Sequence, residues 1–202
     1  MRPRLLTDLS LQLAQTLAFA GIAAWMFEES RGLSGRWEAL QLASAVASCL
    51  LAALALRTLV LLVLDRPLLV LPTRALASGC VQAMIGAAVL GVAAARIHSS
   101  GRPALAAFST ALAVWILALG FDLLPRAWLS RRNLIEHWGR RVALSRLEWF
   151  ELRRAQADPP RLSFIAGDSH AVRVRYRLAV NRETEGLAAH LKDAGLRDRP
   201  PA

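Results

Sequence analysis

Four long apolar stretches constrain this chain more than any other feature of its sequence. They cover residues 9–27, 40–64, 75–95 and 104–124, and most of each is Leu, Ala, Val or Gly on every side. At about 1.5 Å per residue, each stretch is long enough as a helix to cross the ~30 Å hydrocarbon layer of a bilayer. Because a water-soluble bundle would need a polar face on each helix, the sequence predicts four transmembrane helices.

Charge is divided along the chain in the same way. Of the 202 residues, 55% are hydrophobic and 20% are charged, and the formal net charge is +10. Residues 1–124 contribute +3 and residues 125–202 contribute +7 to this charge. The division predicts an all-α membrane bundle over 1–125, followed by a small basic α+β module over 126–202. It excludes a disulfide scaffold, a disordered chain, a coiled coil and a simple soluble enzyme.

The first apolar stretch has two interpretations. Arg2 and Arg4 precede it, and residues 18–20 (Ala-Phe-Ala) resemble a signal-peptidase site. Apolar residues continue to Phe27, which is far enough to span a membrane. We therefore expect an uncleaved anchor.

The short loops predict the orientation of the helices. Arginines gather on one side of the predicted membrane, at Arg2, Arg4, Arg66, Arg74, Arg126, Arg131 and Arg132. On the other side, the loop at residues 28–39 offsets its two arginines with three glutamates. Since cytoplasmic loops carry the excess of arginine, both termini are expected in the cytoplasm. Only one of the 25 basic residues is lysine, a bias typical of GC-rich bacterial genomes, so the expected location is a bacterial inner membrane.

The third apolar stretch carries a small residue at every fourth position. The members of this stripe are Ala75, Gly79, Ala83, Ala87, Gly91 and Ala95. Small residues let another helix approach closely, and such packing drives helix association in lipid. The stripe therefore predicts a helix-packing face, although an alanine-rich helix also produces such stripes by chance. The partner helix could belong to the same chain or to another one.

Charged residues lie within two of the predicted helices. Arg57 stands seven residues before the end of the second stretch, roughly 10 Å deep by helical rise. Asp122, near the end of the fourth stretch, and Asp65 are candidate counter-charges. One interpretation is an ion or proton path, and the other is a snorkelling arginine with a structural partner. The second is favoured, because one arginine and one or two aspartates do not make a relay.

The last third of the chain has the pattern of a hairpin followed by a helix. Residues 161–167 predict a strand, and residues 170–178 alternate strictly between apolar and polar side chains. Val172, Val174, Tyr176 and Leu178 fall on one face of this strand, and Arg173, Arg175 and Arg177 fall on the other. An amphipathic helix is expected to follow, with Asn181 as N-cap and Gly195 as C-cap. Residues 131–156 fit either two strands around a turn at 139–141, which we favour, or one amphipathic helix.

This order of elements resembles the bacterial pleckstrin-homology-like domains that are attached to small multi-pass membrane proteins. The residues behind the resemblance are 132–138, 141–152, 161–177 and 181–196, about a third of the chain. The resemblance implies a non-catalytic module that contacts membranes, partners or itself.

The arginine row predicts what this module contacts. Arg173, Arg175 and Arg177 would stand roughly 6.6–6.8 Å apart on one strand face. Beside an anionic leaflet, each would gain about 1 kcal/mol. An acidic protein partner would use the same row, and the plain alternative is a solvated strand face. Nucleic acid is disfavoured, because single-strand binders add stacking aromatics to a basic groove and Tyr176 falls on the opposite face.

Residues with metal-binding or catalytic chemistry are sparse. The histidines are His98, His137, His170 and His190, and none lies in the middle of a predicted helix. No segment has zinc-ligand spacing, a glycine-rich phosphate loop, HExxH or GxSxG. Cys49 and Cys80 are interpreted as small apolar residues of separate helices. The sequence therefore predicts no cofactor, no metal and no enzyme activity.

The predicted function is that of a non-catalytic accessory or scaffold subunit in a larger membrane assembly. Its partners would be the bilayer, other membrane subunits and anionic lipid headgroups. The first alternative is a small transporter or channel that uses Arg57 and Asp122. The second is a lipid-modifying membrane enzyme.

Overall fold

The chain forms two compact units in the computed structural model, and each is described by itself. The structure describes residues 3–71, 77–124, 127–137, 139–155, 161–180 and 186–198. The helical unit comprises Met1–Leu59 and Ala75–Leu124, and the strand-rich unit comprises Val60–Arg74 and Pro125–Ala202. The strand-rich unit therefore includes the end of the second helix and the segment that follows it.

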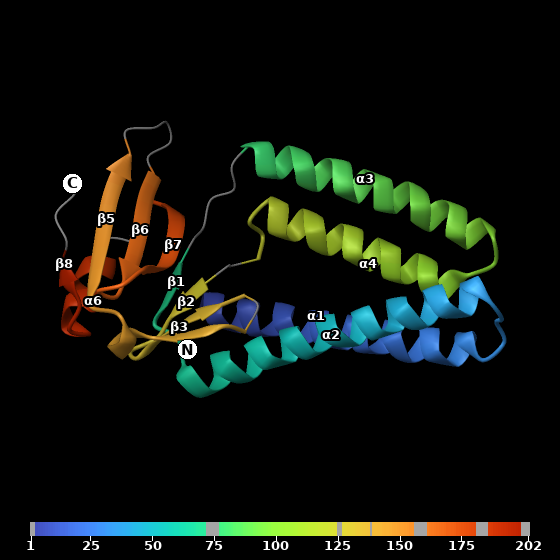
Figure 1. The fold of residues 1–202 in the computed structure, drawn as a ribbon, viewed down its shortest axis with the longest axis horizontal. Helices are drawn as coiled ribbons and strands as arrows, with labels where there is room; N and C mark the ends of the chain where they lie inside the picture. Colours follow the sequence, from blue (N-terminus) through green and yellow to red (C-terminus); the bar gives the residue numbers. More distant parts are fainter. Residues whose placement is uncertain are drawn as a thin grey trace. The chain divides into compact units, whose positions relative to one another are not determined.

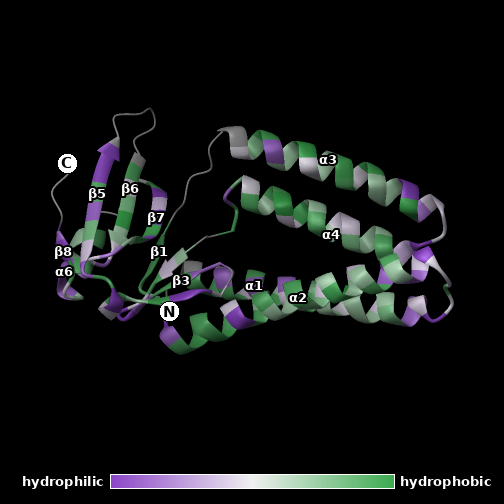
Figure 2. Cartoon of the chain, viewed as in Figure 1, coloured by the Kyte–Doolittle hydropathy of each residue, from purple (hydrophilic) through white to green (hydrophobic). Residues whose placement is uncertain are grey.

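Four long helices dominate the first 120 residues (Figure 1): α1 (Pro3–Ser30), α2 (Arg36–Asp65), α3 (Ala77–Ser99) and α4 (Pro103–Gly120). All four are long and apolar enough to cross a bilayer, and only 17% to 28% of their most apolar windows is buried within the protein. Figure 2 shows hydrophobic residues along the whole length of each helix. Apolar side chains that face outward need lipid around them. The prediction of a multi-pass membrane protein is confirmed.

The fourth helix is shorter than predicted. The apolar stretch runs to residue 124, but α4 ends at Gly120. Asp122 has a φ of 52°, in the left-handed region. The backbone N–H of Leu123 donates to the carbonyl of Ala118 at 2.8 Å, which is the closure of a Schellman-type C-cap. Apolar character alone does not reveal this helix end, because the chain stays apolar beyond it.

The strand-rich unit contains two four-stranded sheets. One has the order β1 (Leu69–Leu71), β2 (Ala127–Leu129), β3 (Asn133–Glu136) and β4 (Arg141–Ala143). The other has the order β7 (Val172–Ala179), β6 (Arg161–Gly167), β5 (Trp149–Ala155) and β8 (Arg197–Asp198). Neighbouring strands are antiparallel, except that β8 pairs with β5 in parallel. A 3-10 turn, η1 (Leu144–Arg146), separates the sheets in sequence, and α6 (Leu187–Asp193) precedes β8.

Residues 131–156 therefore form strands rather than one amphipathic helix, with a turn between β3 and β4 at the predicted position. The strand predicted from residue 142 onward is broken by η1, so it contributes to both sheets. At the end of the chain, α6 is shorter than the predicted helix, and Gly195 follows it with a φ of 88°. The predicted N-cap, Asn181, lies outside the described residues.

Strand β1 was not predicted. It follows α2 in sequence and pairs with β2, so that Val70 faces Trp128 across the ladder. Its apolar run is bracketed by Pro67 and Pro72, a pattern typical of a short buried strand. Leu71 is only 1% exposed. Residues 60–74, which fall in the predicted membrane domain, belong to the strand-rich unit for this reason.

One hydrophobic core joins both sheets and α6. Its large members include Leu134 of the first sheet, Phe150 and Phe164 of the second, and Leu187 and Leu191 of α6. The predicted alternation along β7 holds for Val174, Tyr176 and Leu178, which are buried or half-buried, while the three arginines are exposed. Val172 departs from the prediction and is 53% exposed. The ladder between β6 and β7 shifts register at Ala166 and Gly167, so the alternation slips by one residue there.

Candidate anion-binding groove

Arginines line two adjoining cavities in the strand-rich unit, which together we call the arginine groove. The first lobe, of about 690 Å³, is lined by Asn133, Arg140, Arg141, Val142, Ala143, Arg146, Leu147, Asp168 and Arg173. The second lobe, of about 540 Å³, is lined by Leu64, Asp65, Arg66, Leu68, Ser130, Arg131, Arg132, Asn133 and Arg141. Asn133 and Arg141 are common to both lobes. The groove thus brings together residues from α2, β3, β4, η1 and β7.

The turn between β2 and β3 positions two of the arginines. The Ser130 hydroxyl accepts hydrogen bonds from the backbone N–H of Arg132 at 3.4 Å and of Asn133 at 3.0 Å. The same hydroxyl donates to the Asn133 carbonyl at 3.0 Å. These bonds hold the turn through its one serine, and Arg131 and Arg132 remain exposed at its tip.

Asp65, the last residue of α2, anchors the wall that the two lobes share. Its carboxylate accepts hydrogen bonds from Asn133 Nδ2 at 3.1 Å and from Arg141 Nη2 at 3.0 Å. The Asp65 side chain is 12% exposed and that of Arg141 is 50% exposed. One guanidinium nitrogen of Arg141 is therefore engaged. Because the guanidinium group is planar and rigid, this bond also fixes the directions of its remaining N–H donors.

Asp168 performs the same role in the first lobe. One carboxylate oxygen accepts the backbone N–H groups of His170 and Ala171, at 3.0 and 2.8 Å, and the other accepts Arg173 Nε at 2.7 Å. The bond from Arg173 and the two backbone bonds lower the pKa of Asp168 to about 2. The carboxylate therefore stays ionised at neutral pH and keeps Arg173 in place.

Arg140 is held less tightly. Its guanidinium lies 3.6 Å from the Glu136 carboxylate, and that carboxylate also accepts a hydrogen bond from the Tyr176 hydroxyl at 2.8 Å. Burial, together with the Glu136 charge, raises the pKa of Tyr176 above its usual range. The tyrosine thus remains a hydrogen-bond donor that fixes Glu136 beneath Arg140.

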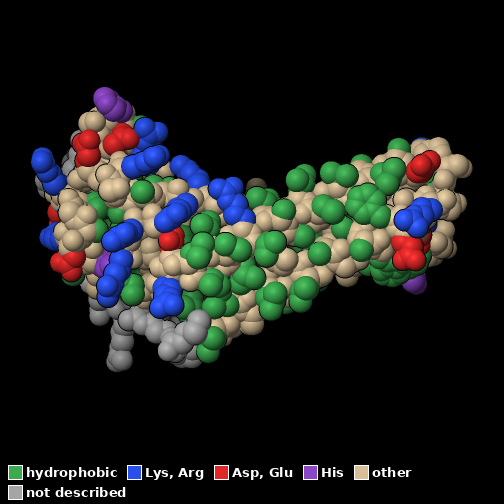
Figure 3. Space-filling view, turned by 90° about the horizontal axis from the view of Figure 1, so that it is seen from below, with side chains coloured by type: hydrophobic (Ala, Val, Ile, Leu, Met, Phe, Trp, Pro, Cys, Tyr) green, Lys and Arg blue, Asp and Glu red, His purple; other side chains and the backbone are tan. Residues whose placement is uncertain are grey.

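The groove carries a large excess of positive charge. Within the described residues, no acidic side chain pairs with the four exposed arginines Arg66, Arg131, Arg132 and Arg146. Figure 3 shows Lys and Arg side chains gathered in a band over the strand-rich unit. Guanidinium groups match phosphate and carboxylate oxygens with two parallel hydrogen bonds. The arrangement is suited to binding an anion that bears such oxygens.

The structure separates the three arginines predicted on β7. Arg173 lines the groove, whereas Arg175 and Arg177 are exposed on the same strand outside it. Of the groove arginines, only Arg173 was predicted as a binding residue, and Arg66, Arg131 and Arg132 were named only as charges that set the orientation. The groove arginines share one sequence feature, because they cluster at the end of a helix and in or beside the turns between short strands.

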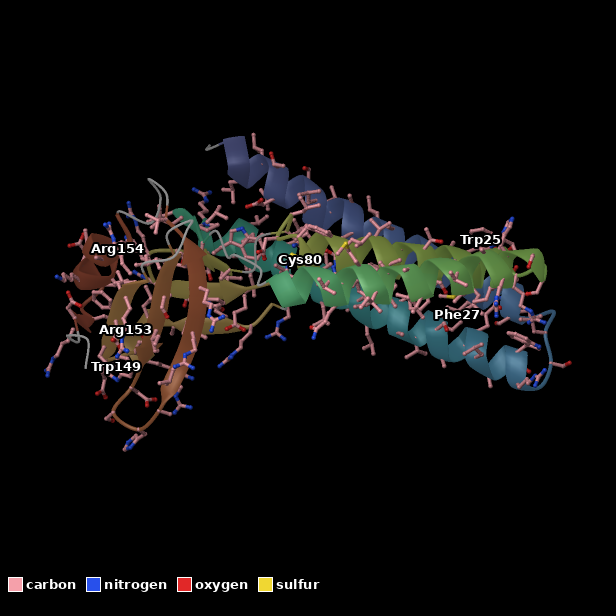
Figure 4. The ribbon with its side chains drawn as sticks, turned by 90° about the horizontal axis from the view of Figure 1, so that it is seen from above. Trp25, Phe27, Cys80, Trp149, Arg153 and Arg154 are labelled. Carbon is pink, nitrogen blue, oxygen red and sulfur yellow. The ribbon has the colours of Figure 1, made fainter. Side chains whose placement is uncertain are left out.

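The small-residue stripe of α3 is also divided. Ala83 and Ala87 are buried, and a Cβ atom placed on Gly120 of α4 would lie 2.2 Å from the Ala83 Cβ. Cys80 Sγ lies 3.3 Å from the Gly120 carbonyl oxygen, to which it donates a hydrogen bond, and Figure 4 shows Cys80 on α3.

Gly91 and Ala95 lie apart from this contact, whereas the Gly79 carbonyl oxygen lies 3.6 Å from the same Cβ position on Gly120. Gly91 and Ala95 are exposed, and a Cβ on Gly79 or Gly91 would meet nothing within 4 Å. An every-fourth pattern drifts around a 3.6-residue helix, so a long stripe leaves the packed face. Ala75 lies outside the described residues.

The charges predicted inside the membrane do not form a described ion pair. Arg57 is exposed on α2, and no described residue pairs with it. Asp122 occupies the left-handed position that closes α4. Asp65 is engaged by Arg141.

Groups with metal-binding chemistry do not converge in the described part of the chain. No cluster of three or more His, Cys, Asp or Glu residues is found there. His137 is buried and stacks on Trp128, and His190 Nε2 lies 3.3 Å from the Ser130 carbonyl oxygen.

No protein-family model, curated protein or solved structure matches this chain. The fold and the groove define a class, a multi-pass membrane protein with an arginine-lined strand-rich unit.

Proposed function

We propose that this protein is a non-catalytic subunit of the bacterial inner membrane whose arginine groove binds anionic phospholipid headgroups at the cytoplasmic surface. The observation that carries the proposal is that Leu64 and Asp65, the last residues of α2, form part of the groove. Both termini are then cytoplasmic, as the loop charges favour.

A membrane-spanning helix that is longer than the hydrocarbon layer is thick extends into the layer of lipid headgroups. α2 is 30 residues long and carries the most apolar of the four candidate spans, and about 20 residues suffice to cross the hydrocarbon. A cavity lined by the last residues of this helix is therefore within reach of lipid phosphates.

The charge of the groove supports the same conclusion. An arginine beside an anionic leaflet gains about 1 kcal/mol. The four groove arginines without an acidic partner, namely Arg66, Arg131, Arg132 and Arg146, would together gain about 4 kcal/mol, or roughly a thousandfold in affinity. An isolated surface arginine row such as Arg175 and Arg177 lacks the cavity that would orient a headgroup.

A scaffold role is compatible with the rest of the molecule. The order of strands, hairpin and helix over residues 132–196 resembles a pleckstrin-homology-like module, which implies binding rather than catalysis. The exposed part of the α3 stripe, Gly91 and Ala95, would allow a helix of another subunit to approach closely.

Lipid-dependent stability tests the proposal on the full chain in a zwitterionic detergent. Addition of phosphatidylglycerol should raise the unfolding temperature of the wild type, and phosphatidylcholine should not, because a ligand stabilises the state that binds it. The double variant Arg132→Gln/Arg146→Gln should lose this response. The matched control, Arg175→Gln/Arg177→Gln, removes the same charge outside the groove and should keep it.

Two results would contradict the proposal. If both double variants lose the response equally, lipid is attracted by net charge and not by the groove. If phosphatidylglycerol has no effect, but an acidic protein co-purifies with the wild type and not with the groove variant, the groove serves a protein partner instead.

A further inference from the structure

We infer that the arginine groove is built for a ligand with two phosphate groups, one in each lobe, joined by a short linker. This inference rests on the proposed function, and it adds the number of the anionic groups and their division between the lobes. The class of ligand is one with two phosphate groups, either a lipid with two phosphodiesters in its headgroup or a soluble compound with two phosphates.

The first argument is the division of the groove. Its lobes have volumes of about 690 and 540 Å³, and each alone falls in the roughly 300–1,000 Å³ range of small-molecule sites. They meet only at Asn133 and Arg141. A single phosphate in one lobe would leave the other unoccupied.

The second argument is the distribution of the free charge. Arg146 belongs to the first lobe alone, and Arg66, Arg131 and Arg132 belong to the second alone. All four are exposed, and none has an acidic partner among the described residues. One phosphate places an anion beside the unpaired arginines of one lobe only, whereas two linked phosphates place an anion in each lobe.

The third argument is that two guanidinium groups are anchored, one in the first lobe and one at the wall that both lobes share. Asp168 holds Arg173 in the first lobe at 2.7 Å, and Asp65 holds Arg141 at the shared wall at 3.0 Å. Each bond engages one guanidinium nitrogen and leaves other N–H donors available. Arg141 therefore stands between the two phosphates and can donate to both, while Asn133 keeps its side chain bound to Asp65.

The test compares ligands at equal total phosphate on the detergent-solubilised full chain. The probes are cardiolipin, which has two phosphodiesters, phosphatidylglycerol, which has one, and inorganic pyrophosphate. Because the second phosphate binds intramolecularly, half-maximal stabilisation by cardiolipin should need at least about tenfold less phosphate than stabilisation by phosphatidylglycerol. The readout is the unfolding temperature followed by tryptophan fluorescence.

Single-lobe variants sharpen the test. Arg146→Gln in the first lobe and Arg132→Gln in the second should each reduce the response to cardiolipin to that of phosphatidylglycerol. Arg177→Gln, which removes one charge outside the groove, should leave the advantage of cardiolipin intact. All three positions are exposed, and an unchanged unfolding temperature without ligand shows that each variant is folded.

The outcomes separate this inference from the proposed function. If cardiolipin and phosphatidylglycerol are equivalent per phosphate, the two-phosphate inference is wrong and headgroup binding stands. If pyrophosphate stabilises the protein and neither lipid does, the lipid function is wrong; the two-phosphate site then stands only if Arg146→Gln and Arg132→Gln each weaken the response to pyrophosphate, and it is wrong if one of them leaves that response unchanged. If none of the three probes acts, both are wrong.

Discussion

The two units of this protein place the same kinds of apolar residue in opposite directions. In the helical unit, large side chains such as Leu50, Val89 and Val92 are more than half exposed. In the strand-rich unit, Phe150 and Phe164 are no more than 1% exposed. The difference shows that apolar side chains avoid water in both units. In the unit surrounded by water they pack into a protein core, whereas in the unit surrounded by lipid they can lie on the surface.

The exposed arginines of the strand-rich unit contrast with the buried polar side chains of the helical unit. Within the helical unit, Ser48 Oγ donates to the Phe19 carbonyl at 2.8 Å, and the fully buried Gln41 donates to the Glu29 carboxylate at 2.7 Å. Those polar side chains turn inward and satisfy neighbouring groups. In the strand-rich unit, the arginines turn outward and leave most of their donors open. This contrast agrees with the proposed function, which assigns anchoring to the helical unit and binding to the strand-rich unit.

The largest expected difference in stability is between truncating a buried side chain of the strand-rich unit and truncating an exposed one of the helical unit. Phe164→Ala should destabilise the strand-rich unit by about 3–5 kcal/mol, because it opens a cavity in its only core among the described residues. Val89→Ala, on the exposed face of α3, should cost no more than about 0.5 kcal/mol. Thermal unfolding of the two variants in detergent measures both. Equal effects would show that the exposed helix face is packed against protein.

The next effect tests the close approach of α3 and α4. Gly120→Ala places a Cβ atom 2.2 Å from the Ala83 Cβ, and such overpacking should cost about 1–3 kcal/mol. Gly91→Ala is the control, because its Cβ meets nothing within 4 Å. If the Gly91 variant is the less stable one in the isolated protein, the helix pair is arranged differently.

A smaller effect should separate stability from ligand binding at Asp65. Asp65→Asn removes the ion pair to the half-exposed Arg141 and should lower stability by about 0.5–1 kcal/mol. It also adds one positive charge to the groove, so the affinity for phosphatidylglycerol should rise. Asp198→Asn, which breaks the exposed pair with Lys192, adds the same charge elsewhere. A lipid titration in which both variants gain equally would contradict a site-specific role.

The smallest effect is confined to acid pH. The pKa of Asp168 is lowered from 3.8 to about 2 in the folded protein, so the folded state binds fewer protons than the unfolded state between these values. Its contribution is complete above about pH 4 and is lost as the pH falls toward 2. Wild type and Asp168→Asn should therefore differ in unfolding temperature at pH 5 and converge only as the pH falls below 2, the folded-state pKa of Asp168. A difference that does not shrink between pH 5 and pH 2 would assign the effect to something other than this carboxylate.

Sequence patterns predicted the elements whose signals are local. Hydropathy over about 20 residues predicted the four helices, and period-two alternation predicted β7 with its outward arginines. The same reasoning missed β1, because the four apolar residues between Pro67 and Pro72 include a strand only when β2 offers them a partner. It also missed the end of α4, where Asp122 adopts a positive φ, because the chain stays apolar to residue 124.

The sequence alone determined that this protein resides in a membrane and carries a basic strand-rich end, since both follow from properties summed over neighbouring residues. Only the tertiary structure decided that the groove exists. Asp65 and Arg141 are 76 positions apart, and they meet because β1, immediately after α2, joins the sheet formed by β2, β3 and β4. A contact of that range depends on which strands pair, and no local pattern specifies the pairing.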